Sequence, residues 1–111
     1  MKTTNLRSVV LERLLADLVL GKEISKTPLD DFLNSPILQL AAEGLANRVG
    51  ESVKQLAKLD PEVFGVGIFR DSIRYRDKIV HHYFEADQIL QYRVITQEFL
   101  KLEAALAEVS K

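Results

Sequence analysis

Residues 70–87 hold most of the side chains in this sequence that could carry out chemistry. The segment contains both histidines of the chain, two of its three tyrosines and three arginines within seven positions. A histidine titrates near neutral pH and can therefore act as a general acid or base. An arginine binds a phosphate group through paired N–H donors. This combination of residue types points to chemistry at a phosphate group.

A helical arrangement sorts the segment into two faces. At about 100° per residue, one face is apolar and carries Phe69, Ile73, Val80 and Phe84, with Arg76 and Tyr83 at its edge. A neighbouring stripe carries Arg70, Arg74, Asp77 and His81. Arg76 is unusual because it lies against the apolar face, where a guanidinium group needs a partner. It either forms an ion pair with a carboxylate of another helix or holds a phosphate in a cleft.

The two adjacent histidines do not make a metal site by themselves. His81 and His82 point about 100° apart on a helix, so they are poorly placed to share one ion. The chain has no other histidine and no cysteine, so a zinc ion would need carboxylates or a second subunit. We therefore expect neither a metal nor another cofactor. For His81, a plain surface or packing role is the alternative to acid–base chemistry.

The composition narrows the class of protein. The 111 residues suffice for one domain, which we expect to span residues 1–111. The 15 basic and 16 acidic residues give a net charge of −1, which excludes nucleic-acid binding by bulk charge but allows a local basic patch. The absence of cysteine excludes disulfides and thiolate nucleophiles. Since no apolar run reaches about 18 residues and no signal-peptide pattern is present, we expect a cytoplasmic protein.

Helix signals dominate the chain. Apolar residues recur at helical spacing over 4–20, and Gly21 follows where a helix would stop. A capping residue precedes a proline at 27–28, 35–36 and 60–61, which predicts a short helix over 28–32, a long helix over 36–59 and a single turn after 61. Further helices are expected over 66–84 and after residue 87. These elements predict an all-α, four-helix, largely antiparallel bundle with one short extra helix, and a leftover apolar face favours a homodimer.

The pattern Arg76-x-x-x-x-His81-x-Tyr83 resembles the signature of HEPN domains, and more narrowly that of the HepT-like toxins of HepT–MNT toxin–antitoxin pairs. In that family a polar residue commonly follows the arginine, and an aromatic and an acidic residue follow the tyrosine. The corresponding residues here are Asp77, Phe84 and Asp87. The resemblance therefore implies a HEPN-type bundle.

The similarity extends from about residue 26 to the C-terminus. The stretch 37–46 resembles the long second core helix of the family. The chain departs from the family pattern at Asp77, where asparagine is common, and at 73–75, where small or apolar residues are expected.

The resemblance implies a metal-independent endoribonuclease toxin that works as a homodimer. His81 would be the general acid or base, Arg76 would bind the scissile phosphate, and Asp77 would orient either one. Because residues five apart on a helix point about 140° away from each other, two facing subunits would line one cleft with both arginines and both histidines. The side chains expected to contact RNA are Arg70, Arg74, Tyr75 and His82, with Tyr83 a further candidate for stacking on bases. For the two arginines, a solvated helix face is the alternative.

The same resemblance implies a protein partner. In the similar toxin pairs, an MNT-type nucleotidyltransferase antitoxin adds AMP to the tyrosine that corresponds to Tyr83, and the new phosphate would compete with RNA for Arg76. Alternatively, Tyr83 is an aromatic residue at the edge of the core. For the whole chain two other hypotheses stay open: a non-catalytic HEPN module that partners a nucleotidyltransferase, and a helical dimer without a site.

Overall fold

The part of the chain that the structure describes is built from helices, without strands. The computed structural model describes residues 2–81 and 88–109, and for residues 2–5 and 75–81 it describes the helical backbone alone. The helices are α1 (Lys2–Ser25), α2 (Leu29–Leu33), α3 (Pro36–Leu59), α4 (Pro61–Phe64), α5 (Gly67–His81), α6 (Gln88–Arg93), the π-helical turn η2 (Val94–Glu98) and α7 (Phe99–Val109). The predicted all-α fold is confirmed.

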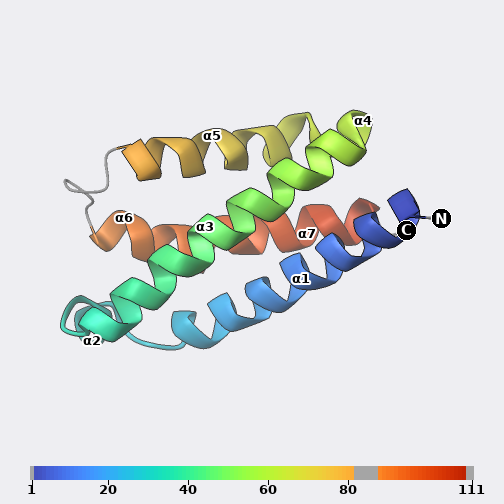
Figure 1. The fold of residues 1–111 in the computed structure, drawn as a ribbon. Helices are drawn as coiled ribbons and strands as arrows, with labels where there is room; N and C mark the ends of the chain where they lie inside the picture. Colours follow the sequence, from blue (N-terminus) through green and yellow to red (C-terminus); the bar gives the residue numbers. More distant parts are fainter. Residues whose placement is uncertain (1, 82–87, 110–111) are drawn as a thin grey trace.

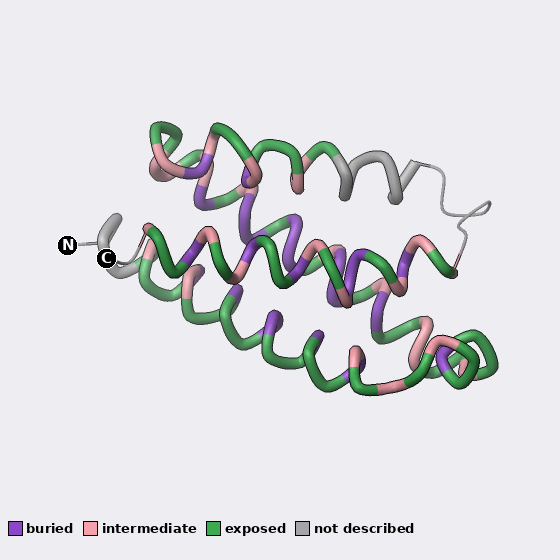
Figure 2. The backbone as a smooth tube through the Cα atoms, turned by 180° about the vertical axis from the view of Figure 1, so that it is seen from behind, coloured by how far each residue is buried: buried purple, intermediate pink, exposed green. Residues whose placement is uncertain are grey.

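Four helical rods form the bundle. The elements α6, η2 and α7 follow one another without a break and together make the fourth rod. Figures 1 and 2 show α1 and α5 at opposite edges of the molecule, with α3 and the fourth rod between them. Consecutive rods run in opposite directions, as predicted, and the short helices α2 and α4 lie at the turns.

Local sequence determines where α3 begins and ends. The Ser35 hydroxyl accepts a hydrogen bond from the N–H of Leu38 at 3.2 Å, and Pro36 occupies the first turn. The helix ends at Leu59, and Pro61 then starts α4. Between these ends one face of α3 packs against α1, α5 and the fourth rod. Its buried residues are Ala42, Leu45, Ala46, Val49, Gly50, Ser52, Val53 and Leu56.

One apolar core joins the rods. The most deeply buried apolar side chains come from α1, α2, α3, α4 and the fourth rod, and they are Leu14, Leu18, Phe32, Val53, Leu56, Phe64 and Ile95. Burying one such side chain stabilises the folded state by about 1.5–3 kcal/mol. The helix α5 adds Phe69, whose ring packs edge-on against Phe64 with a centroid distance of 5.0 Å. This contact anchors the start of α5 to the core.

Two ion pairs connect α1 to α3 and to Asp60, the residue that follows α3. Arg7 lies 3.2 Å from Asp60, and its guanidinium group lies 5.3 Å from the ring centroid of Phe64. Asp17 is only 1% exposed and accepts a hydrogen bond from Arg48 at 3.1 Å. Because a buried carboxylate without a partner is costly, the second pair fixes how α1 lies on α3.

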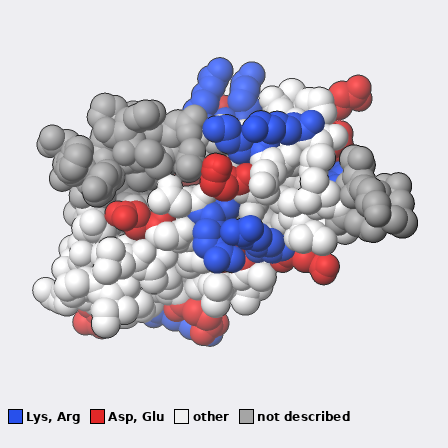
Figure 3. Space-filling view, viewed as in Figure 1, with Lys and Arg blue, Asp and Glu red and all other residues white. Residues whose placement is uncertain are grey.

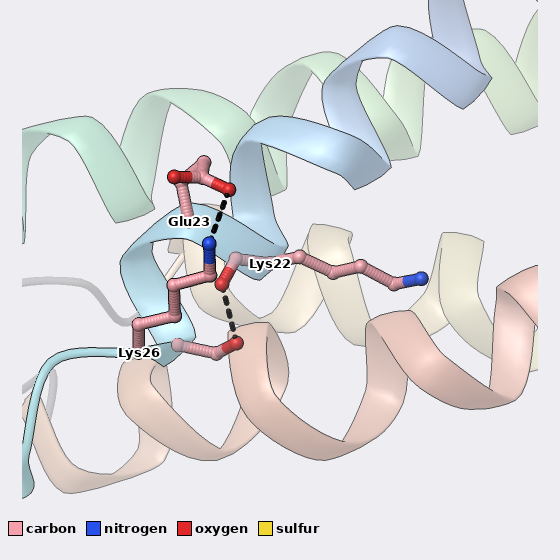
Figure 4. A network of polar contacts seen from close by, with 4 residues as sticks. Lys22, Glu23 and Lys26 are labelled. Atoms are coloured by element: carbon pink, nitrogen blue, oxygen red, sulfur yellow. Dashed lines mark hydrogen bonds and ion pairs between the residues drawn. The ribbon is translucent and has the colours of Figure 1, made fainter.

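The sequence predicted that the first helix stops at Gly21. This prediction is wrong, because α1 continues to Ser25. A Cβ atom at Gly21 would lie 2.5 Å from the ring of Phe99, so this glycine lets α1 and the fourth rod approach closely. At the observed end of the helix, the Ser25 hydroxyl donates to the carbonyl of Lys22, and Lys26 pairs with Glu23 at 2.9 Å (Figure 4).

We expect Gly21→Ala to destabilise the protein. The added methyl group overlaps the Phe99 ring, and such overpacking costs about 1–3 kcal/mol, which exceeds the gain of up to about 1 kcal/mol from the higher helix propensity of alanine. Gly44→Ala is the matched control, because Gly44 lies in α3 with no neighbouring group within 4 Å of its Cβ position. That change should stabilise the protein by about 0.5–1 kcal/mol. Urea unfolding followed by circular dichroism measures both, and equal stabilisation by the two changes would contradict the close approach.

Candidate active site

The helix α5 carries most of the predicted site residues, and its described side chains form an inward and an outward face. The inward residues, buried or half-buried, are Ile68, Phe69, Ser72 and Ile73. Arg70 and Arg74 are exposed. Arg70 comes no nearer than 3.8 Å to Asp71, and both side chains are more than half exposed, so this contact leaves the guanidinium group accessible to an anion.

The helical period assigns the later positions of α5 to the same two faces. Position 76 follows Phe69 by seven residues, or about two turns, and so belongs to the inward side. Positions 77 and 81 follow Arg70 and Arg74 by the same interval and belong to the outward side. The backbone stays α-helical through His81, so positions 76 and 81 are about 140° apart around the axis. One straight helix therefore does not bring these two positions together.

Part of the predicted site lies outside the described residues. His82 and Tyr83 fall there, together with Phe84 and Asp87. For Tyr75, Arg76, Asp77 and His81 the structure gives the place along α5 and no side chain. The chemical roles assigned to these residues therefore stay predictions.

A pocket of about 190 Å³ lies beside α5, between this helix, α3 and the fourth rod. Most of its wall is apolar. Ala46, Ser72 and Val94 each line it from a different rod. The hydroxyl of Ser72 is buried, and it has no hydrogen-bond partner among the residues that the structure describes.

Gln91 on α6 is a second buried polar residue. It is 2% exposed, and neither its side-chain oxygen nor its nitrogen has a hydrogen-bond partner within residues 2–81 and 88–109. Such a buried amide is unfavourable.

The sequence analysis missed these buried polar residues. In the described ranges, the buried side-chain atoms without a partner belong to Ser72, Gln88 and Gln91, all on α5 or α6. A signal for two of them was present in the sequence. Ser72 interrupts the inward stripe of α5, and Gln91 comes one turn before two core residues, Val94 and Ile95.

Basic side chains gather next to the candidate site. Figure 3 shows Lys and Arg side chains over α5 and the middle of α3, with acidic side chains between them. The exposed basic residues of these two helices include Arg48, Lys58, Arg70 and Arg74. Such a local basic surface can attract a polyanion although the chain has a net charge of −1.

Residues 2–81 and 88–109 contain no group of three His, Cys, Asp or Glu side chains that could hold a metal ion. Among the helices described, none is long and apolar enough to cross a membrane.

We expect Gln91→Leu to stabilise the fold. Leucine has a similar size and removes two unpaired polar atoms from the interior, which should raise the free energy of unfolding by about 1 kcal/mol or more. Gln97→Leu, at an exposed position of the same rod, is the control and should change it by less than about 0.5 kcal/mol. Urea unfolding of both variants gives the comparison, and a clear loss of stability in Gln91→Leu would mean that the amide has a partner in the folded protein.

Comparisons with known proteins agree with the resemblance seen in the sequence. The family model described as Ribonuclease HepT-like matches residues 14–109. A protein of Caldanaerobacter subterraneus subsp. tengcongensis with the name "Putative RNase TTE0752" is 29% identical over 80 residues, which cover 72% of this chain and 71% of that protein. No solved structure gives a significant match. The matched family region includes all of α3, α5 and the fourth rod, the elements that surround the candidate site, and the chain thus belongs to the HepT-like ribonuclease family.

Proposed function

We propose that this protein is a metal-independent endoribonuclease that works as a homodimer. Membership of a ribonuclease family supports cleavage of RNA. The observation that carries the finer proposal is the unbroken helix α5, whose exposed stripe of Arg70 and Arg74 continues into the positions of Asp77 and His81. A general acid or base next to cations on a solvent-facing stripe suits a polyanionic substrate.

The proposed reaction uses the RNA's own 2′-hydroxyl as the nucleophile. One histidine accepts the 2′-hydroxyl proton while the 2′-oxygen attacks the adjacent phosphorus, and the bond to the 5′-oxygen breaks. That oxygen leaves with a proton from a second acid, and a 2′,3′-cyclic phosphate remains. His81 would transfer the proton, Arg76 would stabilise the charge on the phosphoryl oxygens, and Asp77 would orient one of them.

The geometry of α5 favours a site built from two chains. Positions 76 and 81 of one helix are separated by about 140° around the axis and by roughly 7.5 Å along it. Two chains related by a twofold axis can place Arg76 of one chain opposite His81 of the other. In this arrangement the homodimer is part of the mechanism.

The RNA strand would follow the basic surface beside this cleft. Arg70 and Arg74 would contact its phosphates. Tyr75 and His82 would contact bases or sugars. This surface contributes affinity for any RNA chain rather than a particular sequence.

We further propose that an MNT-type nucleotidyltransferase antitoxin neutralises the enzyme by adding AMP to Tyr83. The resemblance of 76–83 to the family signature supports this assignment. The added group brings a negative phosphate within two residues of His81, where it would compete with RNA for the same cations. The chain would then be the toxin of a toxin–antitoxin pair.

Cleavage of RNA by the unmodified protein should continue in excess EDTA and should depend on two residues. His81→Ala should lower the rate about 10²–10⁴-fold, and Arg76→Ala about 10²–10³-fold. Arg13→Ala, an exposed arginine on α1 at the opposite edge of the molecule, should leave it unchanged. Circular dichroism checks the fold and intact mass checks for adducts. If the unmodified protein cleaves no RNA, the chain is the non-catalytic binding module instead.

A mixture of the two inactive variants tests the two-chain site. When Arg76→Ala and His81→Ala proteins exchange subunits, half of the dimers are mixed and each contains one complete site, so about a quarter of the wild-type activity should return. If the site lies within one chain, the mixture stays inactive. That result would refute the shared cleft while leaving the nuclease assignment intact.

Co-expression with an MNT-type nucleotidyltransferase tests the role of Tyr83. The wild-type chain should gain the mass of one AMP group and lose RNA cleavage, because the adduct blocks the phosphate-binding cations. Tyr83→Phe should keep its unmodified mass and stay active in the presence of the partner. An adduct on Tyr83→Phe would assign the modification to another residue.

A further inference from the structure

The outward face of α1 carries a stripe of exposed residues with an apolar centre. The two apolar residues, Leu15 and Val19, are 45% and 55% exposed. On its other side the same helix buries Val10, Leu14 and Leu18 in the core. A helix with apolar residues on two sides contributes only one of these sides to its own fold, and neighbouring exposed apolar side chains suit a protein contact surface.

The stripe has the spacing with which two helices pack together. Its exposed positions are 8, 12, 15, 19 and 22, separated by 4, 3, 4 and 3 residues, which is the heptad interval of helix–helix packing. The centre of the stripe is apolar, with Leu15 and Val19. One end carries the acidic Glu12 and the other end the basic Lys22.

This order of charges makes the stripe complementary to itself in the antiparallel direction. If two copies of α1 pair around a twofold axis near residue 17, Leu15 of each faces Val19 of the other, and Glu12 of each faces Lys22 of the other. Both ends of the contact then carry opposite charges. A parallel pair would place like charges together at both ends, and the opposed helix dipoles also favour the antiparallel pair.

The two charged residues are available for such a contact. Glu12 makes no ion pair with any residue in the described ranges. Lys22 binds Glu103 of the fourth rod at 2.8 Å, but half of its side chain stays exposed, and an ammonium group has three donors. Figure 4 shows the Lys22 side chain extending away from the neighbouring pair of Glu23 and Lys26. It can therefore bind a second carboxylate while it keeps its internal partner.

We propose that a second copy of this chain docks on the outward stripe of α1, helix against helix and antiparallel. Since α1 and α5 lie at opposite edges of the bundle (Figures 1 and 2), this contact is separate from the candidate active site. A chain that pairs through both edges forms assemblies larger than a dimer. The α1 contact rests on the stripe alone and does not require nuclease activity.

Charge reversal tests the contact through the mass of the assembly in sedimentation equilibrium. Glu12→Lys places like charges at both ends and should raise the dissociation constant about ten-fold or more. Glu12→Lys combined with Lys22→Glu restores opposite charges and should recover most of the association. Glu103→Gln is the matched control, because it removes the internal partner of Lys22 without changing the stripe.

Cysteine crosslinking tests the register, because the natural chain contains no cysteine. A mixture of Leu15→Cys and Val19→Cys proteins should form disulfide-linked pairs under mild oxidation. Each protein alone should crosslink much more slowly, since identical positions are offset by about 6 Å along the two axes and exceed disulfide reach.

Three results would overturn the proposal. One is an unchanged mass in both Glu12→Lys and Val19→Glu, another is a failure of the double charge reversal to recover association, and the third is equal crosslinking of mixed and single cysteine proteins. Glu12→Lys should keep wild-type RNA cleavage per chain while its assembly mass falls. If Glu12→Lys lost RNA cleavage as well as assembly mass, this contact would not be separate from the active site.

Discussion

The buried face of α3 is the constraint on which the rest of this structure depends. It is the helix against which α1, α5 and the fourth rod all pack, so the chain needs one broad apolar face there. That face is uneven. Leu45, Val53 and Leu56 supply bulk to the core, whereas Ala46 and Gly50 line the pocket beside α5. Small residues at these positions leave space next to the helix that carries the candidate site, and Phe69 anchors the start of that helix.

The local signals in the sequence predicted much of this framework. Ser35 followed by Pro36 predicted the start of α3, because a capping hydroxyl and a proline act within one turn. The assignment of Gly21 as a helix end was wrong for a physical reason. A glycine can end a helix or admit a close neighbour, and the neighbour here is Phe99, 78 residues further along the chain. No local rule contains that contact.

For the candidate site, the sequence predicted the residue types and their positions around the helix, but not the groups that surround them. The position of Arg76 beside the apolar stripe follows from helical periodicity, and the unbroken α5 agrees with it. The pocket and the burial of the Gln91 amide depend on how the rods pack together. The π-helical turn η2 is likewise set by packing, since it shifts the register of the fourth rod after Arg93. Tertiary packing decides these features.

The two edges of the bundle place different demands on the sequence. Along α5, exposed arginines create a local basic surface in a chain whose net charge is −1, so charge is concentrated where a polyanion would bind. Along α1, the outward stripe is apolar in its centre and charged at its ends, which suits a protein surface with the same pattern. Because the two edges lie apart, selection on one leaves the other free to change.

The buried polar atoms on α5 and α6 are a structural argument that this part of the bundle has a function. In the described ranges, Ser72, Gln88 and Gln91 each bury a group without a hydrogen-bond partner, and an apolar side chain in its place would favour folding. Natural sequences tolerate such conflicts mainly where function requires them. Ser72 lies on α5 one turn before position 76, where a guanidinium group would need acceptors. A neutral acceptor such as the Ser72 hydroxyl would hold that arginine without neutralising its charge, and the charge would then remain available for a phosphate.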